Sequence, residues 1–272
     1  MTRNWNRKIE VVFSGKILTL SDVDIEFTYS FNTDENPNEL EVVLYNLSDT
    51  TINTQAVKNK QIMINAGYEG DVGNIAKCVI VSSNTAWHGV DKVTTIKAID
   101  ASDRYLNRSL SKTYKPNTTA LEIIRDISNM TGLAMGEISL VKNISYPRGR
   151  SVTGRLRDIL KSIVTTDCAT NLQVKNGVIL IRNVGAGMAT GAVLSPETGL
   201  IGSLEPVDSN EKIPKEVQPD YKAQCLLNYR IGAMARVRID SRVRKGDAVV
   251  LKGSHSGSKD GDFVTDIEIK MI

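Results

Sequence analysis

The chain contains only two histidines, His88 and His255, and both lie near glycines in sequence that is typical of loops. A Ser-His-Asp triad needs an oriented base and a nucleophile on a structured turn, and the sequence has no Gly-x-Ser-x-Gly motif. Glycoside cleavage needs two carboxylates, but nothing singles out one pair among the 31 acidic residues. We therefore interpret both histidines as solvated turn residues and predict no catalytic site.

The glycine-rich stretch GAGMATG (185–191) invites comparison with a dinucleotide-binding loop. Its third glycine is at 191, where the fingerprint requires 190, no helical pattern follows, and no βαβ unit surrounds it. The sequence also has no phosphate-binding motif of the GxxxxGKS or GxxxxGKT type. We predict a flexible turn here and no cofactor.

Three cysteines, Cys78, Cys168 and Cys225, are isolated from one another in the sequence. Metal sites need clustered His, Cys or carboxylate side chains, and the sequence shows no such cluster. We predict three buried thiols, no disulfide and no metal site.

The stretch ARVRIDSRVR (235–244) has an unusual charge pattern. As a strand it would place on its apolar face Val237, Ile239 and Val243, and on its charged face Arg236, Arg238, Asp240, Arg242 and Arg244. One interpretation is a solvated face over a packed one. A second is a basic ribbon that meets an acidic surface of a neighbouring subunit, where bidentate arginine pairs set the register. A nucleic-acid groove comes third, because no aromatic residues are interleaved.

The stretch NELEVVLYNLS (38–48) is apolar on both faces of a strand. One face carries Leu40, Val42 and Leu44, and the other carries Glu41, Val43, Tyr45 and Leu47. A strand with one wet face would alternate apolar and polar residues, so we expect both faces to be covered. If the second face were exposed to water, the protein would lose about 1.5–3 kcal/mol of hydrophobic stabilisation for each large side chain. We expect a helix or a neighbouring chain to cover Val43, Tyr45 and Leu47.

Composition narrows the class of protein. The sequence is 41% hydrophobic and 24% charged, with a net charge of +3, which is too near balance to imply nucleic acid or an anionic membrane as the main partner. An aromatic share of 5% argues against base-stacking platforms and tryptophan-lined carbohydrate clefts. No apolar run exceeds about four residues, far from the roughly 20 that span a bilayer. Near the N-terminus, Ser14, Gly15 and Lys16 interrupt any signal-peptide core, so we expect the protein to be made and kept in the cytoplasm until something else carries it out.

The first and last thirds of the sequence read as β-structure. Strands are predicted at 8–13, 25–31, 38–48, 61–70, 76–83 and 92–101, with a short helix capped by Ser48 and a turn at 32–38. After a loop-like segment at 184–202, strands are predicted within 225–232, 235–253 and 260–272. Such short strands with turn signals between them are typical of a barrel or a sandwich.

The middle third has a different pattern. A helix is predicted over 117–133, with a capping box of Thr119 and Glu122 and a stop at Gly132. A second helix is predicted over 153–166, and Asn176-Gly177 predicts a hairpin turn. We expect a small α+β module of two helices and a hairpin.

Several motifs together resemble the bacteriophage baseplate hub, or tail hub, family. NELEVVLYNLS, INAGYEG (64–70) and GVDKVTTIKAIDA (89–101) are similar to the N-terminal part of that family. SVTGRLRDILKSI, NLQVKNGVILIRN and SPETGLIGSLE (195–205) resemble its middle, and CLLNYRIGAMARVRI with SHSGSKDGDFVTDIEI (254–269) resembles its last barrel. The likeness covers nearly the whole chain in order. In place of an HxGD run, His255-Ser256-Gly257 is followed by Ser258-Lys259, which displaces the acidic residue to Asp260.

The resemblance implies a mainly β fold with an α+β insert: two tail-tube-like β-barrels joined by a helix-hairpin module. The implied domains are a first barrel at 1–110, the module at 111–184 and a second barrel at 185–272. In one version of this arrangement the second barrel shares strands with the first. The implied assembly is a homotrimer in the virion, a pseudo-six-fold ring between the hexameric tail tube and a three-fold spike or central fibre. The ring would surround the channel for the tape-measure protein and DNA, without sequence-specific DNA binding or membrane contact.

The resemblance also implies a role for the candidate contact residues. Residues that would face another chain, the tail tube protein or other baseplate proteins are Val43, Tyr45, Leu47, Arg236, Arg238, Arg242 and Arg244. Two alternatives stay open: a tail-associated peptidoglycan hydrolase, for which no segment is left over, and a receptor-binding β module, which the low aromatic content disfavours.

Overall fold

A computed structural model describes residues 6–32, 38–100, 106–131, 134–175, 178–182, 187–208 and 218–272. The chain forms two compact units, and the second is inserted in the sequence of the first. The described residues of the first unit come from 6–32, 38–100 and 188–272, and those of the second from 106–187. Most of the chain is in antiparallel sheets, so the prediction of a mainly β protein is confirmed.

Seven strands of the first unit come from the first hundred residues. They are β1 (Arg7–Phe13), β2 (Lys16–Thr19), β3 (Ile25–Asn32), β4 (Glu39–Tyr45), β5 (Gln61–Tyr68), β6 (Asp71–His88) and β7 (Asp91–Asp100). Their order in the sheet is β3-β4-β7-β6-β5-β1-β2. The helix α1 (Asp49–Thr54) begins where predicted, because the Ser48 side chain accepts a hydrogen bond from the Thr51 amide. The predicted turn at 32–38 lies almost wholly outside the described residues.

Six further strands come from the last third of the chain. They are β15 (Met188–Leu194), β16 (Leu200–Pro206), β17 (Tyr221–Leu226), β18 (Ala235–Asp240), β19 (Lys245–Gly257) and β20 (Phe263–Met271). The segment 184–202, predicted to be loop-like, contains two of these strands, β15 and the start of β16. In the glycine-rich stretch, Met188–Gly191 belong to β15, which pairs in parallel with β18 with a register shift between Ala189 and Val193. These residues therefore lie in a strand with an irregularity at Gly191, where φ is 69°, and a flexible turn was predicted there.

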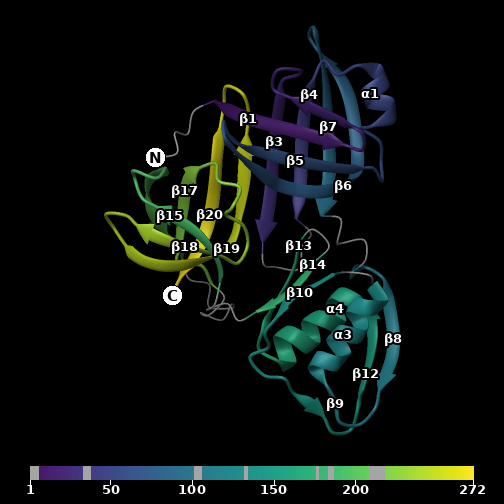
Figure 1. The fold of residues 1–272 in the computed structure, drawn as a ribbon. Helices are drawn as coiled ribbons and strands as arrows, with labels where there is room; N and C mark the ends of the chain where they lie inside the picture. The colour runs from purple at the N-terminus through teal and green to yellow at the C-terminus, as the bar shows by residue number, and fades with distance from the viewer. Residues whose placement is uncertain are drawn as a thin grey trace. The chain divides into compact units, whose positions relative to one another are not determined.

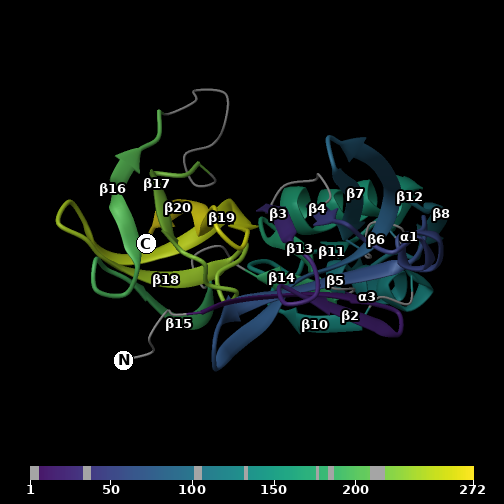
Figure 2. The ribbon, with the colours of Figure 1, turned by 90° about the horizontal axis from the view of Figure 1, so that it is seen from above.

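The long strand β19 joins these two groups of strands (Figures 1 and 2). Its first part pairs with β18, and its second part, Lys252–Gly257, pairs with Phe27–Asn32 of β3. One 13-stranded sheet therefore runs through the first unit. The strands at the ends of its order are β2 and β16, and the described residues form no closed barrel.

His255 lies at the centre of this joint and is 2% exposed, so the prediction of a solvated turn residue is wrong for this histidine. It stands in β19 opposite Tyr29, with the two rings stacked 6.4 Å apart. Nε2 lies 2.9 Å from the carbonyl oxygen of Ile231, which can only accept, so Nε2 carries the proton. Nδ1 lies 2.9 Å from the hydroxyl of Thr265, so both ring nitrogens have hydrogen-bond partners.

Two glycines flank His255 on the same face of β19 and face phenylalanines of β3. Gly253 is opposite Phe31, and Gly257 is opposite Phe27. A Cβ at Gly253 would lie 2.2 Å from the carbonyl oxygen of Asp266 and 2.8 Å from the Phe31 ring. The glycines leave room for the aromatic rings of the other strand, an arrangement known to support glycine in sheets.

Two polar contacts also connect the groups of strands. Arg7, at the start of β1, donates to three carbonyl oxygens of the β19–β20 turn at 2.6–3.2 Å, those of Ser258, Lys259 and Gly261. Asp71, at the start of β6, accepts a bidentate pair of hydrogen bonds from Arg230 at 2.7 and 2.8 Å and a third from the Tyr229 hydroxyl at 2.9 Å. These bonds, the Arg230 pair first, hold the pKa of Asp71 below its ordinary value.

The second unit has its own core. Its helices are α3 (Ala120–Thr131) and α4 (Leu156–Lys161), the latter continued by a π-helical turn, η1 (Ser162–Asp167). Its strands are β8 (Ser109–Tyr114), β9 (Thr118–Thr119), β10 (Ala134–Ile138), β11 (Ser145–Tyr146), β12 (Arg150–Arg155), β13 (Asn171–Lys175) and β14 (Val178–Arg182). Isoleucines and leucines of the helices pack with Ile179 and Ile181 of β14.

The capping box of α3 is confirmed: the Thr119 amide donates to the Glu122 carboxylate at 2.7 Å, and the Glu122 amide donates to the Thr119 hydroxyl at 3.4 Å. The second helix begins at Leu156, later than predicted, because 150–155 form β12 and pair with β8. β13 and β14 pair antiparallel, while Gly132 and the predicted turn Asn176-Gly177 lie outside the described residues. All three cysteines are buried free thiols, as predicted.

Replacing Gly253 by alanine should destabilise the first unit because the added methyl group has no room between β20 and Phe31. We expect Gly253→Ala to lower the free energy of unfolding by about 1–3 kcal/mol, the usual range for an overpacked core. The neighbouring Ser254→Ala, whose side chain points to the other face, should cost less than about 0.5 kcal/mol. Urea denaturation of both variants tests this, and equal losses would contradict it.

Asp71 should make stability depend on pH. Because its folded pKa is depressed, its contribution is present above the ordinary value of 3.8 and is lost as the pH falls through the folded value. The side chains of Arg230 and Asp71 are 45% and 30% exposed, so the pair contributes about 1 kcal/mol at most. We expect Asp71→Asn to be less stable than the parent chain at pH 7, with the difference fading below pH 3.8. Urea denaturation over this range measures it, and a constant difference would contradict it.

Candidate interaction surfaces

A groove of about 640 Å³ is lined by the outer face of β3 and β4 and by the β19–β20 turn. We name it the acidic groove because its lining has one lysine, Lys259, against six carboxylates, those of Asp24, Glu26, Glu41, Asp91, Asp260 and Asp262. Asp24 lies 3.5 Å from Lys259, and Glu41 lies 3.4 Å from Lys97, all with side chains at least half exposed. Most of the negative charge is therefore left without a cation in the described part of the chain.

Two of the candidate contact residues, Val43 and Tyr45, line this groove and are half-buried. The Tyr45 hydroxyl donates to the Glu26 carboxylate at 3.1 Å. Burial raises the pKa of Tyr45, and its bond to Glu26 raises it further. The second face of β4 thus offers a small apolar floor, with carboxylates around it.

Leu47 lies elsewhere: it is 2% exposed and packs in the core of its own unit. The strand ends at Tyr45, and Asn46 adopts a left-handed conformation with φ 55°, so the alternation of side chains stops before Leu47. A side chain enclosed in this way has no surface for a neighbouring chain. The interpretation of Leu47 as an intersubunit contact is therefore wrong.

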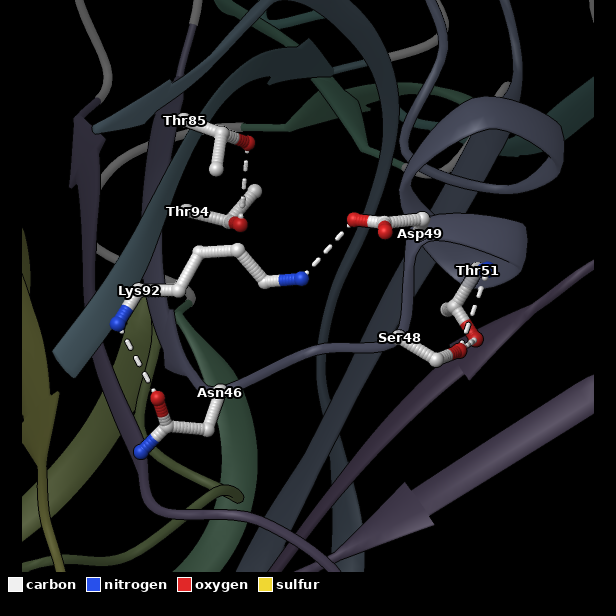
Figure 3. A network of polar contacts seen from close by, with 7 residues as sticks. All are labelled: Asn46, Ser48, Asp49, Thr51, Thr85, Lys92 and Thr94. Carbon is white, nitrogen blue, oxygen red and sulfur yellow. Dashed lines mark hydrogen bonds and ion pairs between the residues drawn. The ribbon is translucent and has the colours of Figure 1, made fainter. Parts of the chain in front are cut away.

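A polar network fixes the end of the groove near Asn46 (Figure 3). The Lys92 amide donates to the side-chain oxygen of Asn46 at 2.9 Å, and the Lys92 ammonium lies 2.8 Å from Asp49 of α1. The amide group of Asn46 donates in turn to Asp91 at 2.9 Å. These bonds tie the turn after β4 to the β6–β7 hairpin, so the groove keeps its shape at this end.

The strand β18 confirms part of the predicted charge alternation. Val237 and Ile239 are buried, while Arg236 and Arg238 are exposed. The strand ends at Asp240, earlier than predicted, because Ser241 closes a turn: its amide and its hydroxyl both donate to the carbonyl oxygen of Arg244. Val243 is in this turn and is 59% exposed, so its predicted place on the buried face is wrong.

We define the basic ribbon as five exposed cationic residues: Arg236, Arg238, Arg242, Arg244 and Lys245. Arg236 pairs with Asp247 at 2.5 Å and holds the pKa of that carboxylate below its ordinary value. Lys245 pairs with Asp240 at 2.6 Å, and Arg244 donates to the Tyr221 hydroxyl at 3.1 Å. Arg238 and Arg242 form no ion pair with any described residue. Within the described part of the chain these two arginines lack an ion pair, although Arg238 is near enough to Asp247 to help lower the pKa of that carboxylate.

A second groove, of about 660 Å³, has a different electrostatic character. It is lined by β16, β17, β19, β20 and the end of β3. Its Glu268 lies between Lys252 at 3.1 Å and Lys222 at 3.8 Å, and Gln224 donates to Asp266 at 2.8 Å. Its charges are largely paired within the chain, so it attracts a charged partner less than the acidic groove does.

The structure also bears on His88, on possible metal ligands and on membrane-spanning helices. His88 is exposed at the end of β6, as predicted. Among the described residues, no group of three or more His, Cys, Asp and Glu side chains is arranged to hold a metal ion. In that same part of the chain, no helix is both long and apolar enough to cross a membrane.

Sequence reasoning missed the acidic groove. Its carboxylates come from four stretches, at 24–26, 41, 91 and 260–262, which the sheet brings together through the pairing of β19 with β3. Each stretch alone is an ordinary polar segment. The one signal in the sequence was the acidic alternation of Asp24 and Glu26 beside apolar Ile25 and Phe27.

Alanine substitutions separate the core residue from the surface residue. Leu47→Ala should lower the free energy of unfolding by about 2–5 kcal/mol, because it removes a fully buried side chain. Tyr45→Ala should cost the isolated chain less than about 1.5 kcal/mol, since it removes one exposed hydrogen bond and a half-buried ring. Thermal and urea denaturation measure both effects, and a larger loss at Tyr45 than at Leu47 would contradict this placement.

No protein-family model matches the sequence, and no curated protein sequence matches it significantly. Solved structures do match its fold. A tail protein from Neisseria meningitidis MC58 matches with a TM-score of 0.70 and 7% identity, over 98% of this chain and 97% of that chain. The 43 kDa tail protein of prophage MuSo2 from Shewanella oneidensis matches with a TM-score of 0.69 and 8% identity, over 98% of each chain.

A third similar structure comes from a component of the E. coli type VI secretion system, described as similar to the bacteriophage T4 tail proteins gp27 and gp5. It matches with a TM-score of 0.65 and 9% identity, over 96% of this chain and 76% of that chain. At these identities the likeness concerns the fold. The chain therefore has the fold of phage tail proteins along nearly its whole length, as the resemblance in its sequence predicted.

Proposed function

We propose that this chain is a structural hub of a phage or phage-like tail baseplate. Three copies close into a ring around the channel through which the tape-measure protein and DNA pass. One side of the ring meets the hexameric tail tube, and the other meets a three-fold spike or central fibre. The observation that carries this proposal is the match of the fold to two tail proteins over 98% of the chain.

The architecture of the first unit supports the adaptor role. Each chain contributes two groups of strands, one from β1 to β7 and one from β15 to β20, joined through β19. We propose that these correspond to the two tube-like barrel domains, at 1–110 and 185–272, with the module at 111–184 between them in sequence. Three copies then present six β units, the number needed to match a six-fold tube.

A three-fold ring also constrains the surfaces of each chain. Contacts around a three-fold axis are heterologous, so one surface of the chain must fit a different surface of the next copy. The chain has two surfaces of opposite charge, the basic ribbon and the acidic groove. The half-buried Val43 and Tyr45 are available to such a contact, as are the exposed arginines of the ribbon.

The partners follow from the same proposal. The neighbour from the type VI secretion system is described as similar to gp27 and gp5, which supports contact with a spike protein and with other baseplate proteins. In this role the chain binds through surface fit and catalyses no reaction. It is located in the virion tail after synthesis and assembly in the host cytoplasm.

Mass measurement of the purified chain tests the trimer. Analytical ultracentrifugation at micromolar concentrations should give three times the monomer mass, because obligate interfaces are large and stable. Imaging of assembled particles should then place three copies around the channel. A chain that stays monomeric at every concentration, and is found away from the channel in particles, would contradict the hub.

A further inference from the structure

The two charged surfaces of the first unit carry an inference that rests on the proposed trimer. The acidic groove has six carboxylates and one lysine in its lining, and the basic ribbon has five cations. Folding does not bring the two together, since no residue of the ribbon lines the groove. Each surface therefore keeps charges that have no ion-pair partner among the described residues of one copy.

The unpaired charges are the relevant ones. On the ribbon, Arg238 and Arg242 have no ion pair with a described residue, and both are exposed. On the groove, Asp260 and Asp262 are exposed on the β19–β20 turn, and their carboxylates likewise have no cation among the described residues. Arg7 holds this turn in place by donating to its backbone carbonyls, so the two carboxylates are presented on an ordered loop.

We propose that the basic ribbon of one copy binds in the acidic groove of the next copy and that this contact closes the ring. Arginine guanidinium groups form bidentate hydrogen bonds with carboxylates, which gives the contact a fixed register. The Tyr45 ring and Val43 form an apolar floor on which a guanidinium and its methylene stem can pack. The contact is heterologous, as a three-fold ring requires.

The composition of the ribbon favours a protein surface over nucleic acid. Asp240 and Asp247 lie among its cations, and both form ion pairs with them. A phosphate backbone would be repelled by these carboxylates, and no aromatic residue is interleaved along β18 to stack on bases. The acidic groove offers carboxylates to the arginines and needs no aromatic residues for base stacking, so it suits the ribbon better than nucleic acid does.

Charge reversal tests the contact. The ribbon variant is Arg238→Glu with Arg242→Glu, and the groove variant is Asp260→Lys with Asp262→Lys. Each places like charges opposite one another, so each should weaken self-association at least about tenfold. The chain that carries all four substitutions restores opposite charges and should recover most of the parent's association. Sedimentation equilibrium measures the association constants, and thermal melting of each variant verifies its fold.

A matched control changes charge elsewhere. Lys58→Glu with Lys60→Glu makes the same charge change as the ribbon variant, at exposed positions outside both surfaces. It should associate like the parent chain. Raising the salt concentration should weaken the self-association of the parent chain and of the quadruple variant alike, since exposed ion pairs are screened.

The outcomes separate the two proposals. If the parent chain forms trimers and the ribbon variant forms them equally well, the contact proposed here is wrong and the trimeric hub stands. If the ribbon variant and the groove variant both dissociate, and the quadruple variant is folded but stays dissociated, the pairing of ribbon with groove is wrong. If the parent chain never associates, in solution or in particles, the hub and this contact both fail.

Discussion

The pairing of β19 with β3 is the contact on which the first unit depends. Without it, the strands from the first hundred residues and those from the last third would be separate sheets. The pairing is possible because Gly253 and Gly257 admit the rings of Phe31 and Phe27, while His255 fills the space between them. An imidazole suits this place, since it packs like an aromatic ring against Phe31 and also hydrogen-bonds to the Ile231 carbonyl oxygen and the Thr265 hydroxyl.

The same joint builds the acidic groove. The β19–β20 turn reaches the outer face of β3 and β4 only because β19 continues past β18 to pair with β3. The backbone carbonyls of that turn are bound by Arg7, and its carboxylates remain free to face outward. Packing in the core and charge on the surface are thus set by one strand, which links the stability of the unit to the surface proposed for assembly.

Local patterns in the sequence predicted those parts of the fold that local forces determine. The alternation in 25–31 and 235–240 and the capping box of Thr119 and Glu122 are confirmed, because side-chain burial and helix capping act over a few residues. His255 was misinterpreted because its glycine neighbours are typical of a turn, whereas here they make room for rings from a strand over 200 residues away in the sequence. Leu47 and Val243 were misplaced because the strands end before them, at Tyr45 and Asp240. The arginine ribbon could be predicted from its alternation, but the groove could not, since distant segments compose it.

The order of the strands along the chain has a consequence for synthesis. β3 is made well before β19 and β20, which follow it by more than 200 residues in the sequence. During translation the hydrogen-bonding edge of Phe27–Asn32 is unpaired until Lys252–Gly257 has been made. An unpaired edge of this kind is a template for pairing with another chain. Neighbouring nascent copies on one messenger therefore present each other with the same open edge until β19 has been made.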